Sequence, residues 1–320
     1  MARASLNQSR GCTQLPSGAD AKSIPQVSVI IPSYQSAGHI RKCLRSLEEQ
    51  KTRVVYEVVL VDSSSDGTHS IVSVEFPWVR MTHFPDRKTT GEGRNLGIAL
   101  ARGRFILFTD TDCVASPEWV ERMYDAFDRY SALGVGGPMA NGTPWSPTGT
   151  AGFYLEFFRF QGAGGEPFPV HFLVGGNSGF RREIFRDASY SDDSLGEDML
   201  FSWRASLKGT IMFVPKAEIL HSNRTSIGVF LAYQRKIGRA AVKYRSAVSP
   251  EVIRIFRMVP IASLLLPFVI IPWIAAVTLV RAGLRDLISF LLLLPLCFAG
   301  SFAWAWGFRE ALNRGEREPA

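Results

Sequence analysis

The chain reads Phe105-Ile-Leu-Phe-Thr109-Asp110-Thr111-Asp112 at the point that decides its fold. This is a short apolar run that ends in two aspartates one residue apart. The run is aromatic and β-branched and follows Gly103, which predicts a buried strand. In an open α/β sheet, ligands bind outside the carboxyl ends of the strands. We therefore expect Asp110 and Asp112 to lie where a binding site would form.

Two carboxylates this close repel each other unless positive charge lies between them. A divalent cation that also binds substrate phosphates would supply that charge, and Mg²⁺ and Mn²⁺ prefer such oxygen ligands. An Asp-x-Asp pair also occurs in ordinary solvated loops, so the interpretation depends on the surrounding sequence.

Short apolar runs alternate with helical patterns along the first part of the chain, which predicts an α/β fold with a mostly parallel sheet and helices on both faces. The expected strands are residues 27–31, 56–61, 79–83 and 105–108, and the expected helices include one from Ile40 and one over residues 94–101.

Acidic residues follow these strands in order. Asp62 ends the second strand, Asp86 lies just beyond the third, and Asp110 and Asp112 end the fourth. If the strands are parallel neighbours, these carboxylates gather at one edge with the loop at residues 32–34. Such an edge suits a nucleotide, with an aspartate for the base or ribose and a metal for the phosphates.

Three later features bear on the same site. The small residues of Val174–Arg182 allow the backbone to approach a ligand closely. Glu197 and Asp198 begin a predicted helix, where acids favour the helix dipole but where a carboxylate can also act as a general base. His221 follows a short strand, and both a structural and a metal-ligand role remain open for it.

The net charge and the cysteine content limit which binding partners and which classes of protein fit the sequence. The chain has 320 residues and a net charge of +7, and residues 224–257 hold eight Lys and Arg against the single acid Glu251. This basic segment precedes a long apolar run, which favours anionic membrane lipids over nucleic acid as its partner. Four scattered cysteines argue against a zinc site or a disulfide framework.

Two uncharged runs lie near the C-terminus, over residues 258–280 and 287–308. Each exceeds the roughly 20 residues needed to cross a hydrocarbon core of about 30 Å. We expect an antiparallel transmembrane hairpin, kinked or re-entrant at its prolines. The flanking arginines place both termini, and the globular part, on the cytoplasmic side of the cell inner membrane.

These patterns predict a division of the chain into successive regions: a tail over residues 1–24, a catalytic domain over 25–247 with a nucleotide-binding half (25–115) and an acceptor half (116–247), a basic linker over 248–257, the hairpin over 258–308 and a polar tail over 309–320.

Taken together, the motifs resemble the family 2 glycosyltransferases of the membrane-anchored bacterial type, which have the A-type nucleotide-diphospho-sugar transferase (GT-A) fold. The resemblance covers residues 27–245 and depends on segments in a fixed order: Pro32 with Tyr34, Val61–Thr68, Gly93–Gly97, Thr109–Asp112, Gly175–Arg182 and Gly196–Asp198.

The resemblance implies a nucleotide-diphospho-sugar donor, with uridine diphosphate as the commonest carrier. Pro32 and Tyr34 would lie on the donor side, and Asp62 would contact the base with help from Arg94. Asp110 would lie near the ribose or the metal.

The resemblance also assigns catalysis and the acceptor side. Asp112, with Asp110 and His221, would hold Mn²⁺ or Mg²⁺, and Asp198 would be the catalytic base with Glu197 beside it. The acceptor would be a lipid-linked or membrane-proximal glycan, attacked with inversion. The residues implied on the acceptor side are Gly176, Asn177 and Arg181.

Some positions depart from the family pattern. Gln35 stands where Asn is usual, and the loop after Asp62 is one residue short. The Gln-x-x-Arg-Trp motif of processive polymer synthases is absent, since residues 233–237 do not match it. We therefore expect one sugar to be added at a time.

Two other functional classes remain possible interpretations of the sequence. A nucleotidyltransferase of similar fold would also use paired carboxylates and a metal, but it should carry a basic, glycine-rich loop after the first strand, and residues 32–38 contain none. A non-catalytic sugar-nucleotide-binding or scaffold protein would have no reason to keep Glu197 and Asp198.

Overall fold

The computed structural model describes residues 24–162, 164–192 and 195–314. Its main sheet has eight strands in the order β3-β2-β1-β4-β9-β6-β10-β8. The strands are β1 (Val27–Ser33), β2 (Tyr56–Asp62), β3 (Arg80–His83), β4 (Phe105–Phe108), β6 (Gly134–Gly136), β8 (Phe168–Pro169), β9 (Ser178–Arg181) and β10 (Ile211–Phe213).

The first four strands are parallel to one another, so the predicted α/β fold is confirmed. The other half of the sheet is mixed. Strand β9 runs antiparallel to both β4 and β6, while β6 and β10 are parallel. A second sheet of three strands contains β5 (Cys113–Ala115), β11 (Ile219–His221) and β7 (Met139–Asn141), in that order.

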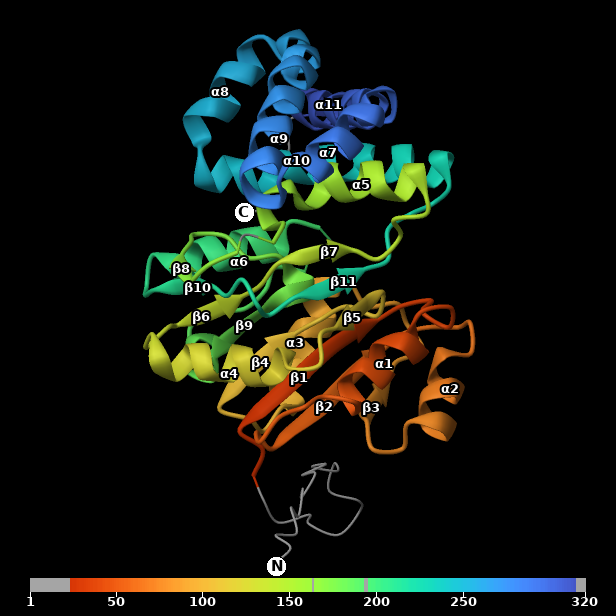
Figure 1. The fold of residues 1–320 in the computed structure, drawn as a ribbon, viewed down its shortest axis with the longest axis vertical. Helices are drawn as coiled ribbons and strands as arrows, with labels where there is room; N and C mark the ends of the chain where they lie inside the picture. Colours follow the sequence, from red (N-terminus) through yellow and green to blue (C-terminus); the bar gives the residue numbers. More distant parts are fainter. Residues whose placement is uncertain (1–23, 163, 193–194, 315–320) are drawn as a thin grey trace, which may run out of the picture.

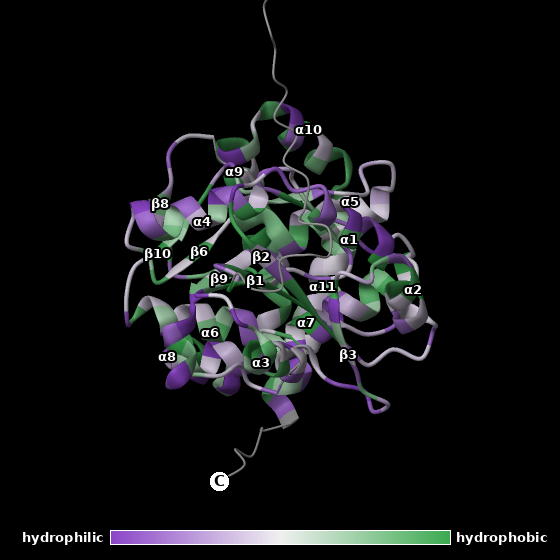
Figure 2. Cartoon of the chain, turned by 90° about the horizontal axis from the view of Figure 1, so that it is seen from below, coloured by the Kyte–Doolittle hydropathy of each residue, from purple (hydrophilic) through white to green (hydrophobic). Residues whose placement is uncertain are grey.

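Helices cover both faces of the main sheet because its central strands are apolar on both sides. Along β4, Phe105 and Leu107 join one core cluster, and Ile106 and Phe108 join the other. The first cluster includes residues of α1 (Ile40–Glu48), α2 (Thr68–Glu75) and α4 (Trp119–Arg129), and the second includes residues of α6 (Glu197–Ser206). Figure 2 shows β1 and β2 as hydrophobic in the centre of the molecule.

Helix α3 (Thr90–Leu100) begins one turn earlier than the predicted helix over residues 94–101. The Thr89 hydroxyl accepts a hydrogen bond from the Glu92 N–H, and the Glu92 carboxylate accepts one from the Thr89 N–H. This capping box satisfies two free N–H groups of the first turn, and it fixes the start of the helix that carries Arg94.

The remaining helices form a layer above the sheets in Figure 1. They are α5 (Pro147–Phe157), α7 (Ile227–Val248), α8 (Pro250–Met258), α9 (Leu266–Ala282), α10 (Leu284–Leu292) and α11 (Leu294–Arg314), with 3₁₀ turns η1 (Phe158–Phe160) and η4 (Pro260–Leu265). Two further 3₁₀ turns, η2 (Gly175–Asn177) and η3 (Arg182–Arg186), flank β9 of the main sheet. The segment expected as a basic linker is thus mostly the helix α8. Ile271, Ile274, Phe290 and Cys297 belong to the same core cluster as the central strands.

The second apolar run bends where a kinked or re-entrant hairpin was expected. Within the described residues, Pro260–Ala282 is long and apolar enough to cross a membrane, and the second run is broken between α10 and α11 by a bend of 74°. Pro295 is the second residue of α11, and proline lacks the N–H that would continue a helix from the preceding turn.

Helix α11 packs closely along α7 through two glycines. A Cβ on Gly307 would lie 1.9 Å from the Arg235 carbonyl oxygen, and one on Gly238 would lie 2.0 Å from the Trp304 carbonyl oxygen. The two backbones can approach this closely only because neither glycine has a side chain.

We predict that Gly307→Ala destabilises the protein by about 1–3 kcal/mol, the usual cost of forcing an extra methyl group into packed structure. Thermal unfolding in detergent would measure it. Gly228→Ala is the matched control, because a Cβ there meets no atom within 4 Å. Equal melting temperatures for Gly307→Ala and Gly228→Ala would refute the close packing.

Candidate active site

A cavity of about 530 Å³ is lined by residues that follow the central strands and by residues of the helical layer. Most of the residues predicted for the site line it. They are Pro32, Tyr34, Arg94, Asp110, Asp112, Gly176, Glu197, Asp198 and His221. The sequence-based expectation that strand ends and the start of α6 meet at one place is therefore matched by the geometry.

Asp112 and His221 lie next to each other in the wall of this cavity. Asp112 lies in the turn just before β5, and His221 is the last residue of β11. The His221 Nε2 atom is 3.5 Å from Asp112 Oδ2. The His221 Nδ1 atom is paired with Asn223 Oδ1 at 2.8 Å, which directs Nε2 towards Asp112. Despite burial, this carboxylate raises the pKa of His221 to about 9, and despite its own burial the pKa of Asp112 falls to about 2 because of His221.

Arg94 is the buried cation of the site. Its Nη1 donates to Glu197 Oε1 at 2.5 Å, and its Nη2 donates to Asp110 Oδ1 at 3.3 Å, while only 2% of the side chain is exposed. Burial opposes its charge, yet these two carboxylates outweigh that cost and raise the pKa of Arg94. Arg94 therefore joins α3 to the end of β4 and to α6, and its help in base binding stays a prediction.

Glu197 and Asp198 have different surroundings. Burial raises the pKa of Glu197 to about 7 even though Arg94 opposes the rise. Asp198 has no ion pair among the described residues. Its Oδ2 accepts from the Gly175 N–H at 2.7 Å and its Oδ1 from the Met199 N–H at 2.8 Å. Two backbone groups thus orient the Asp198 carboxylate at the cavity wall.

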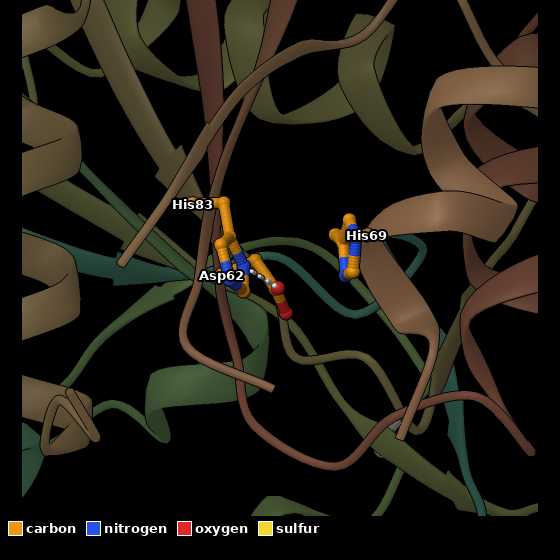
Figure 3. Close-up of side chains that lie close together, drawn as sticks. All are labelled: Asp62, His69 and His83. Carbon is orange, nitrogen blue, oxygen red and sulfur yellow. Dashed lines mark hydrogen bonds and ion pairs between the residues drawn. The ribbon is translucent and has the colours of Figure 1, made fainter. Parts of the chain in front are cut away.

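Asp62 does not line the cavity. It is 0% exposed, and its carboxylate accepts from the Ser33 hydroxyl at 2.8 Å, from the Ser64 hydroxyl at 2.6 Å, and pairs with His83 Nδ1 at 2.7 Å. Figure 3 shows His83 beside Asp62, with His69 of α2 opposite them. Because Asp62 is covered, the partly exposed His83 is the group of this pair that a ligand can reach.

Two residues expected on the acceptor side have structural contacts instead. Asn177 is fully buried, and its amide donates to the Pro138 and Ala217 carbonyl oxygens at 2.9 and 2.8 Å. Arg181 donates to the Ala132 and Phe127 carbonyl oxygens. These bonds fix β9 and the adjoining turns, and neither side chain reaches the cavity.

Comparison with known proteins identifies the family. Residues 28–188, half of the chain, match the family model described as "Glycosyl transferase family 2". The chain belongs to glycosyl transferase family 2. The resemblance drawn from its motifs is thereby confirmed, as is its assignment to the glycosyltransferases.

Curated relatives support the same family. The chain is 36% identical over 104 residues to glycosyltransferase AglE of Haloferax volcanii, covering 31% of this chain and 34% of that protein. It is 33% identical over 110 residues to the succinoglycan biosynthesis protein ExoO of Rhizobium meliloti, covering 34% of this chain and 32% of that protein. The matches thus span about a third of each relative.

Solved structures share the fold. S. aureus TarS 1-349 in complex with UDP-GlcNAc superposes with a TM-score of 0.53 at 20% identity, covering 90% of both chains. GalNAc-T7 with UDP, GalNAc and Mn²⁺ gives a TM-score of 0.51 at 15% identity, covering 64% of this chain and 45% of that one. The GT-A architecture of this family 2 member is therefore confirmed.

The cavity of this family 2 glycosyltransferase is also lined by a cluster of polar side chains that was not predicted from the sequence. Gln234 Nε2 donates to Glu156 Oε1 at 2.8 Å, and Arg224 lies 3.6 Å from Glu156 Oε2 and 3.2 Å above the Tyr233 ring. These residues come from α5, α7 and the segment before α7. The only sequence signal was indirect, since Arg224 opens the basic segment and Glu156 interrupts an aromatic run.

We predict that Arg94→Met lowers the free energy of unfolding by about 3–5 kcal/mol, because it leaves buried Glu197 and Asp110 without their cation. Adding Glu197→Gln should recover part of this loss, since one uncompensated charge is then removed. Chemical unfolding would measure both variants.

Arg122→Met is the control. Arg122 forms a partly exposed pair with Glu118 on α4, and such pairs contribute about 0–1 kcal/mol. If Arg94→Met costs no more than Arg122→Met, Arg94 does not hold the site together.

Proposed function

We propose that this family 2 glycosyltransferase transfers a single sugar from a uridine-diphospho-sugar to a hydroxyl of a lipid-linked or membrane-proximal acceptor, with inversion at the anomeric carbon. The observation that carries the proposal is the composition of the cavity. One continuous space is lined by carboxylates from the strand ends and by apolar residues from α9 and α11.

The donor side of the proposal draws on the shared fold. The TarS structure contains UDP-GlcNAc and the GalNAc-T7 structure contains UDP and Mn²⁺, and both have the fold of this chain. Tyr34 lines the cavity with the Arg87 guanidinium 4.5 Å from its ring, and His83 is accessible beside Asp62. These groups can stack on and hydrogen bond with a nucleobase.

The oxygen and nitrogen atoms of Asp110, Asp112 and His221 are suitable ligands for a divalent cation. Asp112 Oδ2 and His221 Nε2 are 3.5 Å apart, and a ligand atom of Asp110 lies within 4.8 Å of one of Asp112. The Asn223 contact to the other ring nitrogen is the kind of support that metal-bound histidines have. Cys113 lies in the same cluster, but a buried thiol does not suit Mg²⁺ or Mn²⁺. Bound there, the cation would supply positive charge to the donor diphosphate.

Asp198 is the proposed general base. Its carboxylate is oriented by two N–H groups, whereas Glu197 is occupied by Arg94. The Asp198 carboxylate would take the proton of the acceptor hydroxyl as that oxygen attacks the anomeric carbon from the face opposite the diphosphate. Attack from that face inverts the configuration at this carbon.

The helical layer sets the proposed location. Pro260–Ala282 is apolar and long enough to cross a membrane, and it leaves large side chains exposed along its length, among them Leu265, Phe268, Val269 and Val280. We propose that these residues contact the lipids of the cell inner membrane while the cavity opens on the cytoplasmic side.

We predict that Asp198→Asn lowers turnover by at least about 100-fold, since general base catalysis is worth about 10²–10⁴-fold, while donor binding persists. Release of UDP from UDP-GlcNAc and related sugars, with a membrane lipid extract as acceptor, would measure turnover. Asp125→Asn, on the exposed face of α4, should leave it unchanged. Release of pyrophosphate in place of UDP would instead indicate a nucleotidyltransferase.

We also predict that Asp112→Asn weakens Mn²⁺ binding at least about tenfold and that Asn223→Ala, which removes support from His221, weakens it by about 10–100-fold. Titration of Mn²⁺ followed by electron paramagnetic resonance would measure both affinities. Asp66→Asn, in the loop before α2, is the control. Wild-type affinity in Asp112→Asn would exclude this metal site.

A further inference from the structure

Two arginines on the membrane side of the cavity have no part in the chemistry described so far. Arg159 belongs to η1, and Arg245 lies in the last turn of α7, and both line the cavity. The wall around them is apolar and comes from the C-terminal helices. It consists of Ile270, Trp273 and Ile274 of α9 and Trp304 of α11.

Neither guanidinium has an acidic partner among the residues that the structure describes. Arg159 lies 4.4 Å from the centre of the Trp273 ring, and Arg245 lies 5.4 Å from that of Tyr244. The Arg245 Nε atom is buried and has no hydrogen-bond acceptor. Burial lowers the pKa of Arg159; Tyr244 opposes this shift, and the positive charge of Arg245 adds to it.

Other arginines in α7 and in the segment just before it do have acidic partners. Arg235 and Arg239 both pair with Glu310 of α11, and Arg224 lies near Glu156. Arg159 and Arg245 are like charges that face one cavity, and neither forms an ion pair with a described carboxylate, so they repel each other; an anionic ligand between them would remove that cost. Arginine is the side chain best suited to phosphate, because its fork of N–H donors matches the phosphate oxygens.

We propose that Arg159 and Arg245 bind the phosphate or diphosphate group of a lipid-linked acceptor, whose apolar chain lies against Trp273 and the neighbouring residues of α9 and α11. This inference rests on the proposed function, since it names the part of the acceptor that the cavity recognises. It also explains why the cavity extends from the carboxylates into the helical layer: the phosphate and the chain bind at its far end, and the acceptor hydroxyl reaches Asp198.

The test uses the full chain in a non-ionic detergent, with farnesyl diphosphate as the probe and quenching of tryptophan fluorescence as the readout. Trp273 and Trp304 line the proposed site, so binding should change their emission. We expect Arg159→Gln combined with Arg245→Gln to weaken binding about 10–100-fold, the range for losing hydrogen bonds to a charged group. Lysine at both positions should restore part of the affinity.

The matched control is Arg254→Gln combined with Arg257→Gln. It removes the same charge from exposed positions of α8 that do not line the cavity, and it should change affinity less than twofold. An equal loss in the control, or no loss in the Arg159 and Arg245 variant, would overturn the assignment.

Comparison ligands separate the possible sources of the phosphate. Farnesol and inorganic pyrophosphate should each bind more weakly than farnesyl diphosphate. Displacement by phosphatidylglycerol at equal concentration would assign the pair to bilayer headgroups, and displacement by UDP would assign it to the donor; either result would refute the proposal.

Binding of UDP, measured by thermal shift in the same variants, should be unchanged. If the wild type binds UDP but not farnesyl diphosphate, only this inference fails. If it binds neither, the proposed function fails as well.

Discussion

The buried pairing of Arg94 with Glu197 and Asp110 is the interaction on which the rest of the site depends. One guanidinium connects the start of α6, the end of β4 and the middle of α3. The surrounding chain is shaped to admit it, since a Cβ on Gly175 would lie 2.2 Å from Arg94 Nη2. A low-dielectric interior does not tolerate uncompensated carboxylates, so the cation allows acids from distant segments to share one cavity.

This pairing also separates the carboxylates by role. Glu197 and Asp110 are tied to Arg94, and Asp112 is opposite His221. Among the residues that the structure describes, Asp198 forms no ion pair and accepts hydrogen bonds from two backbone N–H groups, which is why we propose that it takes the substrate proton. The division follows from which side chains the fold brings within reach of Arg94.

Much of the first half of the fold could be predicted from sequence because its strands are apolar runs bounded by polar turns. Strands such as Gly134–Gly136 and Ser178–Arg181 carry no such pattern, and their place in the sheet depends on pairing with β4 and β10, which no local signal encodes. Pro295 indicated a kink near the start of α11. Whether a proline kinks a helix or ends it, however, depends on packing. Here α11 turns aside to lie along α7, where Gly238 and Gly307 permit close contact.

Site residues could be predicted where they directly follow a strand, because the end of the strand then places them at the edge of the sheet. Asp110 and Asp112 follow β4 in this way and line the cavity. Asp62 also ends a strand, but β3 pairs its His83 directly with Asp62, and two serine hydroxyls cover the carboxylate. Asn177 and Arg181 were expected on the acceptor side because the family resemblance implied it. In the structure their polar atoms bond to backbone carbonyl groups, which sequence alone does not reveal.

The helical layer is more than an attachment to the sheet. Its residues Ile271, Ile274 and Phe290 pack in the same core as the central strands, and Trp273 and Trp304 form part of the cavity wall. A site built only from strand ends would be open to water on that side, where an apolar chain could not be held. Because α9 and α11 close the cavity with apolar side chains, the segment that we propose contacts the membrane also shapes the space in which the proposed acceptor would approach Asp198. On this proposal, membrane association and acceptor selection would both follow from one packing arrangement.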